Sequence, residues 1–124
     1  MIYLDSHIVV WLYAGLVDKF SQPVKTLMNE NEVFISPIVR LELQYLFEIQ
    51  RVKDNANVIM ADLSNRLGLQ VCDKDFDAIV SQAMAVSWTR DPFDRVIVAN
   101  AALHDNVLIS KDQNILDNYV HARW

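Results

Sequence analysis

Ile2-Tyr3-Leu4-Asp5 opens the chain with three apolar residues followed directly by an acid. This pattern predicts a short buried strand that ends at a carboxylate, and Ser6 is expected to cap the helix that follows. Val107-Leu108-Ile109-Ser110 repeats the pattern, and Asp112 follows it. Because sites in parallel sheets form beyond the carboxyl ends of the strands, we expect these two strands to be central neighbours, with Asp5 and Asp112 at one edge.

Helix and strand signals alternate along the rest of the chain. Ser36-Pro37 is a strong helix start, Asp73 is expected to cap a later helix, and Gly68 is expected to end the helix before it. The remaining helices are predicted near residues 21–31, 37–51, 54–67, 76–86, 92–104 and 115–116, and the remaining strands near 33–35, 69–72 and 119–122. The predicted fold is one α/β domain over residues 1–124, with three layers and a central parallel sheet of four to five short strands flanked by helices.

The composition fits one compact soluble domain, because 52% of the 124 residues are hydrophobic and 22% are charged. A single cysteine, Cys72, excludes an internal disulfide framework and is expected to be a buried core thiol. The uncharged run Ile8–Leu16 is far shorter than the ~20 residues of a spanning helix, and no basic segment precedes it. We therefore expect a cytoplasmic protein without a membrane segment.

Two acids occupy positions where a solvated side chain is not expected. Glu42 falls within the apolar stripe of its helix, where a carboxylate is costly unless it is paired or metal-bound. Asp94 lies in the first turn of the helix that begins at Pro92, on the same face as Ile97. Asp91 is equally compatible with a helix cap and with an auxiliary site residue. The predicted stripe beside Glu42 consists of Ile38, Leu41, Tyr45, Leu46 and Ile49.

Asp5, Glu42, Asp94 and Asp112 form the candidate site. Four carboxylates at one sheet edge repel one another, at roughly 3 kcal/mol per pair for ~5 Å and an effective dielectric of ~20. Such a cluster requires protons or cations, and hard oxygen donors point to Mg²⁺ or Mn²⁺ instead of zinc. The three histidines lack zinc-ligand spacing, and the chain contains no Gly-rich phosphate loop or nucleophile-elbow serine.

The segments that carry these acids resemble the PIN domain, and most closely the VapC-like toxins of bacterial and archaeal toxin–antitoxin pairs. The resemblance extends from Asp5 to Trp124, and the run Arg90–Arg95 is its most specific part. Trp88-Thr89 departs from the family pattern, because relatives often carry a histidine there. The matching segments are Tyr3-Leu4-Asp5-Ser6-His7, Ser36-Pro37 with Glu42, Arg90-Asp91-Pro92-Phe93-Asp94-Arg95 and Ser110-Lys111-Asp112.

This resemblance implies a Mg²⁺- or Mn²⁺-dependent endoribonuclease that cuts single-stranded regions or loops of RNA and is inhibited by a cognate antitoxin. It also implies a homodimer. Asp5 and Asp94 would hold the principal metal, while Glu42 and Asp112 would orient it, bind a second ion or steer the attacking water. The remaining matches to auxiliary positions are Asp91, Ser6 and Ser110.

A net charge of −5 is the wrong sign for a protein that binds RNA through a basic face. The five candidate acids account for it, because the other eleven acidic residues balance the eleven basic ones. The cations considered for phosphate contacts are Arg40, Arg51, Lys53, Arg90, Arg95 and Lys111. Trp11, Trp88 and Trp124 are expected in the core or at its edge, not as base-stacking platforms. Two interpretations remain open for Leu43, Phe47 and Met60. They pack in the core, or they line a surface that binds an antitoxin segment or a second copy of the chain.

Two other functions are considered. A phosphoacceptor receiver domain also has an acidic Mg²⁺ pocket, but it requires paired acids after the first strand, and Ser6-His7 follows Asp5 here. A PIN relative that binds without catalysing would be expected to have lost one acid of the quartet, and none is missing.

Overall fold

The computed structural model describes all 124 residues, and its five strands form one parallel sheet in the order β3-β2-β1-β4-β5. The predicted α/β fold is confirmed, with β1 and β4 as central neighbours. The elements are β1 (Ile2–Leu4), α1 (Ser6–Tyr13), the 3₁₀ helix η1 (Val17–Lys19), α2 (Gln22–Glu30), β2 (Val33–Ile35), α3 (Pro37–Glu48), α4 (Ala56–Leu67), β3 (Gln70–Val71), α5 (Phe76–Ala83), α6 (Pro92–Ala102), β4 (Val107–Ile109), α7 (Gln113–Asn118) and β5 (Ala122–Arg123).

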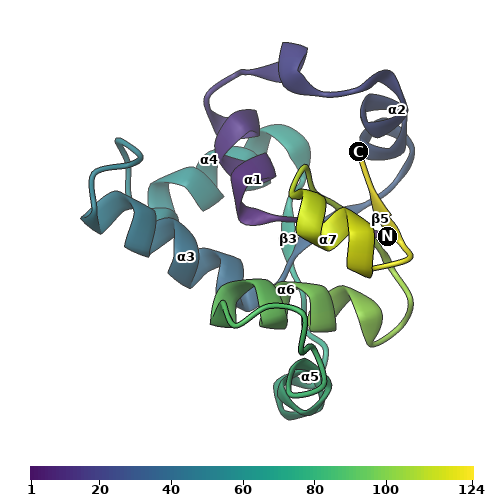
Figure 1. The fold of residues 1–124 in the computed structure, drawn as a ribbon. Helices are drawn as coiled ribbons and strands as arrows, with labels where there is room; N and C mark the ends of the chain where they lie inside the picture. Colours follow the sequence, from purple (N-terminus) through teal and green to yellow (C-terminus); the bar gives the residue numbers. More distant parts are fainter.

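Helices cover both faces of the sheet. In Figure 1, α5 and α6 lie below the strands, while α1, α2 and α4 lie above them. The strands are short and apolar because they are buried from both sides, and Leu4, Ile35 and Leu108 are all 0% exposed. None of the helices has both the length and the apolar character needed to cross a membrane.

The strand register brings distant segments to one edge of the sheet. Leu4 pairs with Ile109, and the backbone N–H of Asp5 donates to the Ile109 carbonyl at 3.0 Å. Ile109 in turn pairs with Arg123, whose carbonyl accepts from the Ser110 N–H at 3.1 Å. The carboxyl edge of the sheet therefore gathers the residues that follow β1, β4 and β5.

Several predicted helix caps are wrong by one or two residues. Asp5, not Ser6, caps α1: its backbone is extended and its carboxylate accepts from the Ser6 N–H. Likewise Asp75, not Asp73, caps α5. Helix α4 begins two residues later than predicted, after an Asn55 cap. Each of these segments offers neighbouring side chains that can accept from a first-turn N–H, so the backbone conformation selects between them.

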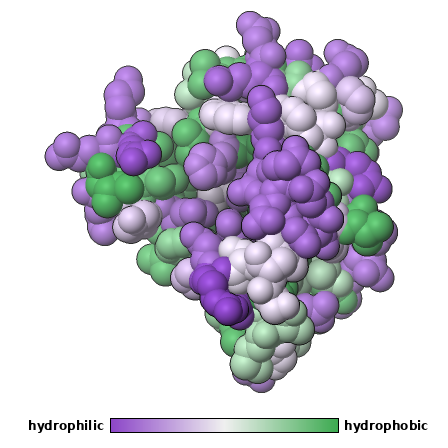
Figure 2. Space-filling view, viewed as in Figure 1, coloured by the Kyte–Doolittle hydropathy of each residue, from purple (hydrophilic) through white to green (hydrophobic).

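The predicted apolar stripe of α3 faces the solvent for most of its length. Leu41, Tyr45 and Ile49 are 58%, 49% and 43% exposed, whereas Val39 and Leu43 on another face are fully buried. The helix thus has two apolar faces, and only one packs on the core. A groove contact for Leu43 is excluded by its burial. Figure 2 shows apolar side chains gathered at the left, over the C-terminal end of α3.

The remaining predictions about individual residues largely hold. Gly68 ends α4 with a positive φ of 68°, and Cys72 is buried and accepts a hydrogen bond from the Tyr3 hydroxyl at 3.1 Å. All three tryptophans are partly buried against the core. The last strand lies later in the chain than predicted. β5 covers Ala122–Arg123 instead of 119–122, because Tyr119 is the C-cap of α7.

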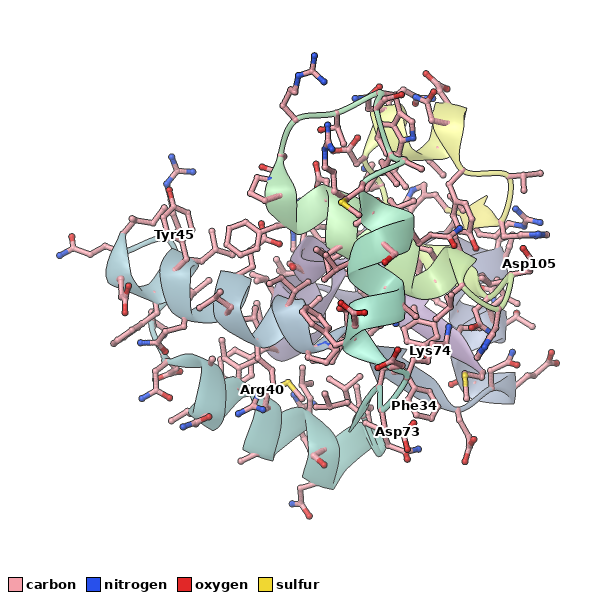
Figure 3. All side chains as sticks on the ribbon, turned by 90° about the horizontal axis from the view of Figure 1, so that it is seen from below. Phe34, Arg40, Tyr45, Asp73, Lys74 and Asp105 are labelled. Atoms are coloured by element: carbon pink, nitrogen blue, oxygen red, sulfur yellow. The ribbon has the colours of Figure 1, made fainter.

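Lys74 ties three segments together beneath the sheet. Its Nζ donates to the Asn100 carbonyl at 2.6 Å and to Asn106 Oδ1 at 2.7 Å, and it lies 4.7 Å from the centre of the Tyr3 ring. Burial lowers the pKa of Lys74. Figure 3 shows Lys74 close to Phe34, whose ring packs on Tyr3. The lysine therefore acts as a structural link between the start of α5, α6 and the start of β4.

Candidate active site

Asp5 is the most buried acid of the molecule, with only 5% of the residue exposed. Its Oδ1 accepts from the Ser6 N–H and its Oδ2 accepts from the Ser110 hydroxyl, both at 2.8 Å. Burial raises the pKa of Asp5, while these two hydrogen bonds and nearby His7 oppose the rise. The carboxylate is thus held in one orientation by a helix cap on one side and a strand-end serine on the other.

Glu42 reaches the same edge from α3. The Ser6 hydroxyl donates to Glu42 Oε1, so Ser6 connects the first turn of α1 with the middle of α3. Burial raises the pKa of Glu42, the hydrogen bond from Ser6 lowers it, and the charges of Asp5 and Asp91 raise it further. The sequence placed Glu42 correctly beside the core, although the stripe used to place it is mostly exposed.

The pKa of Asp94 is affected by the charge of every other acid of the candidate site. Burial is the largest cause that raises its pKa, from 3.8 to about 7, and the negative charges of Asp5, Asp91, Asp112 and Glu42 all add to the rise. Repulsion of this kind falls off quickly with distance in a protein near water. The other four acids singled out in the sequence therefore lie close enough for their charges to act on Asp94, although no three of the five converge on one ion position.

Asp91 and Asp112 are both helix caps. Asp91 Oδ1 accepts from the Asp94 N–H at 3.0 Å, and Asp112 Oδ1 accepts from the first-turn N–H groups of α7. The Ser110 hydroxyl also accepts from the Asp112 N–H at 3.0 Å, which links Asp112 to Asp5 through one side chain. Asp91 therefore caps α6, which is one of the two roles left open by the sequence, and its charge adds to the rise in the pKa of Asp94.

The loop before α6 is organised by Thr89. Its hydroxyl accepts from the Asp91 N–H at 3.2 Å, and its carbonyl accepts from Arg95 Nε at 2.9 Å. The departure of Trp88-Thr89 from the family pattern thus coincides with local contacts that hold the Asp91 cap in place. This role of Thr89 could not be predicted from local sequence, because its hydrogen bonds are set by the loop conformation.

The donor set suits a hard divalent cation. All the candidate ligands are carboxylates, and their mutual repulsion is visible in the raised pKa of Asp94. No group of three or more His, Cys, Asp or Glu side chains is arranged to hold an ion directly. This arrangement is compatible with Mg²⁺, which usually keeps several waters and is bound through only one or two carboxylates.

An apolar cavity lies away from these acids. Its volume is about 600 Å³, and most of its lining residues are apolar. They come from α1, η1, α2 and α4 and include Phe20, with Val33 and Leu69 at the amino ends of β2 and β3. None of its lining residues is Asp, Glu, His or Cys. The candidate acids at the carboxyl edge of the sheet are therefore separate from this cavity.

The fold and the site together define a single-domain α/β protein with an acidic site at the carboxyl edge of a parallel sheet. The family model of the PIN domain matches residues 2–120, and the chain belongs to this family. The predicted family is thereby confirmed. A comparison with curated proteins gives no match.

Solved structures share the fold over almost the whole chain. One such structure is VapBC2 from Rickettsia felis bound to a DNA fragment from the VapBC2 promoter. One of its chains has 20% identity and a TM-score of 0.70, and the match covers 100% of this chain and 99% of that one. A chain of a toxin–antitoxin complex from Klebsiella pneumoniae has 16% identity and a TM-score of 0.69. The match covers 100% of this chain and 97% of that one. A chain of VapBC-1 from nontypeable Haemophilus influenzae has 19% identity and a TM-score of 0.64. The match covers 99% of this chain and 97% of that one.

Proposed function

We propose that the protein is a Mg²⁺- or Mn²⁺-dependent endoribonuclease whose active site consists of Asp5, Glu42, Asp94 and Asp112. The observation that carries the proposal is the convergence of Asp5, Glu42 and Asp112 through Ser6 and Ser110. Burial and the neighbouring acids, which raise the pKa of Asp94 to about 7, add to this observation. A site with this much uncompensated negative charge is suited to a divalent cation and, through it, to a phosphodiester. Membership of the PIN family also supports a nuclease function.

The side chains divide the work according to how they are held. Asp5 and Asp94 are the proposed principal ligands, with Asp5 fixed by Ser6 and Ser110. Near neutral pH, Asp94 holds or releases a proton according to whether a cation is present, because the two compete for the same carboxylate. When bound, the cation supplies Lewis-acid activation of water and offsets charge on the scissile phosphate.

Glu42 and Asp112 complete the site. Ser6 orients Glu42, whose pKa is raised by burial, and this side chain is suited to take the proton from the attacking water. The cap geometry commits Asp112 Oδ1 to the backbone of α7, which leaves Oδ2 for water or a second cation. Asp91, Ser6 and Ser110 are proposed as positioning residues that hold these carboxylates.

The test is cleavage of a structured RNA pool with Mg²⁺ or Mn²⁺ and with EDTA. Asp5→Asn and Asp94→Asn are expected to abolish cleavage, since each removes a charged ligand while keeping the shape of the side chain. Glu30→Gln is the matched control, because Glu30 ends α2 before β2 begins and so lies toward the amino edge of the sheet. Full cleavage in EDTA, or by Asp94→Asn, would refute the proposal.

The partners proposed for the chain are a cognate antitoxin and a second copy of itself. The antitoxin is supported by the fold shared with chains of toxin–antitoxin complexes and by the resemblance of the acidic motifs to VapC-like toxins. A homodimer is supported by Leu41, Tyr45 and Ile49, which present an exposed apolar stripe on successive turns of α3. Co-purification of the product of an adjacent small reading frame tests the antitoxin.

A further inference from the structure

A cluster that we name the lysine–aromatic cluster reaches the acidic edge of the sheet through Lys111 and Trp124, which follow β4 and β5. It consists of Trp11, Phe20, Trp124, Lys19 and Lys111. The ring of Trp11 lies 5.8 Å from that of Trp124, and Phe20 contacts both tryptophans, with centroids 6.3 Å and 5.8 Å away. The residues come from α1, η1 and the segments that follow η1, β4 and β5.

Both lysines of the cluster are held over indole rings. Lys111 Nζ lies 5.8 Å from the centre of the Trp11 ring and 5.4 Å from that of Trp124, and Lys19 Nζ lies 5.2 Å from the Trp11 ring. Cation–π attraction restrains an ammonium group without neutralising its charge. The two lysines are therefore positioned, yet their charges remain free for another partner.

Neither lysine has an acidic partner, although acids are abundant in this chain. Acids outnumber basic residues by sixteen to eleven, and the one ion pair in the structure joins Arg66 to Asp62. Lys19 and Lys111 are both exposed and neither forms an ion pair. Lys19 and Lys111 are thus two restrained cations, neither of them in an ion pair, and positive groups of this kind can bind a polyanion.

The position of the cluster relates it to the acids. Lys111 lies between Ser110, which donates to Asp5, and Asp112. Trp124 follows Arg123, whose carbonyl accepts from the Ser110 N–H. The chain end that carries Trp124 lies near α1 and α2 in Figure 1. A strand that places one phosphate at the acidic site would therefore pass this cluster on the β5 side.

We propose that Lys111 and Lys19 bind backbone phosphates of single-stranded RNA on the β5 side of the cleavage site, and that Trp11 and Trp124 hold these lysines in place. The proposal rests on the proposed function for its substrate class. The cluster supplies positioning by phosphate contacts, which carry affinity without reading sequence. It also supplies the positive charge that the acidic site lacks.

The test is the salt dependence of RNA binding, which does not depend on cleavage. Fluorescence anisotropy of a labelled single-stranded oligoribonucleotide is measured with Mg²⁺ in an Asp94→Asn background at several salt concentrations. Each phosphate contact contributes about 0.7 to the slope of log affinity against log salt for single strands. Lys111→Gln and Lys19→Gln are each expected to reduce the slope by about this amount, and the double variant by about twice as much. Lys25→Gln, in the cavity near the amino edge, is the matched control and should leave the slope unchanged.

The tryptophans separate two ways in which the cluster could act. If Trp124 holds Lys111, then Trp124→Leu should reduce the salt slope as Lys111→Gln does, and Trp124→Phe should restore it. A loss of affinity in Trp124→Leu with an unchanged slope would show base stacking and overturn the phosphate role. An unchanged slope in the double lysine variant would also overturn it. Salt-dependent RNA binding that requires the lysines, in a wild-type protein that does not cleave, would refute the proposed function and leave this inference standing.

Discussion

Replacing Asp94 by asparagine should stabilise the metal-free protein at alkaline pH. Between pH 3.8 and about 7 the folded chain keeps a proton on Asp94 that the unfolded chain has released. Unfolding then releases a proton, so the free energy of unfolding falls as the pH rises through this window. Above about pH 7 both states are ionised and the full penalty is present. The Asp94→Asn variant carries no charge at this position and should avoid the penalty.

The size of the effect follows from the same pKa. The difference between 3.8 and about 7 corresponds to at most ~4 kcal/mol. Asp94 is only partly buried, so solvent screening reduces this to about 1–2 kcal/mol. A charge in the first turn of α6 also interacts favourably with the helix dipole, and its loss subtracts ~0.3–1 kcal/mol. The expected net gain is about 1 kcal/mol at pH 8, or a few degrees in Tm.

Urea or thermal unfolding at pH 4, 6 and 8, in EDTA, measures this directly. Asp94→Asn should match or fall slightly below the wild type at pH 4 and exceed it at pH 8, while Glu30→Gln should show no pH-dependent difference. Added Mg²⁺ should raise the Tm of the wild type at pH 8, because a ligand that binds only the folded state stabilises it, and should raise that of Asp94→Asn much less. An Asp94→Asn variant that loses stability relative to the wild type between pH 4 and 8 would refute the reasoning.

Three further changes test other parts of the structure. Lys74→Met keeps the aliphatic packing but removes the charged donor to Asn106, so it should lower the free energy of unfolding by about 1.5–3 kcal/mol in urea titrations; no change would mean that the link is not structural. Ser110→Ala removes a hydrogen bond that opposes the raised pKa of Asp5, so the acid limb of the pH–cleavage profile should move to higher pH, and an unmoved limb would contradict this role. Leu41→Lys should shift the protein from dimer to monomer in light scattering, because Leu41 is 58% exposed and lies outside the core; a wild-type protein that is monomeric would refute the proposed dimer.

The sheet could be predicted because its signals are local. Three apolar residues followed by an acid mark a strand and its carboxyl end, and parallel strands place those ends together. The prediction for Glu42 shows what periodicity in the sequence cannot decide. Residues spaced by four define two apolar faces on α3, one through Val39 and Leu43 and one through Leu41 and Tyr45. Periodicity cannot choose between them, because the packing of neighbouring helices decides which face is buried.

Contacts between distant segments could not be predicted in the same way. The hydrogen bond from Ser6 to Glu42 requires α1 and α3 to meet, and the position of Trp124 beside Lys111 requires β5 to pair with β4. From the sequence, Lys111 is only one of several cations that could contact phosphate, and Lys19 has no feature that distinguishes it. The tryptophans were correctly expected at the edge of the core, but their role toward the lysines depends on the tertiary structure.

The dual position of the acids affects how genetic screens of this protein should be interpreted. Asp5, Asp91 and Asp112 each cap a helix and also carry charge into the site. Alanine at any of them removes a ligand or neighbouring charge and also costs roughly 0.5–2 kcal/mol of helix stability, whereas asparagine keeps a good cap. A screen for loss of the proposed activity would therefore recover alanine substitutions partly through low protein abundance. Only the asparagine variants, at normal abundance, would report on chemistry alone.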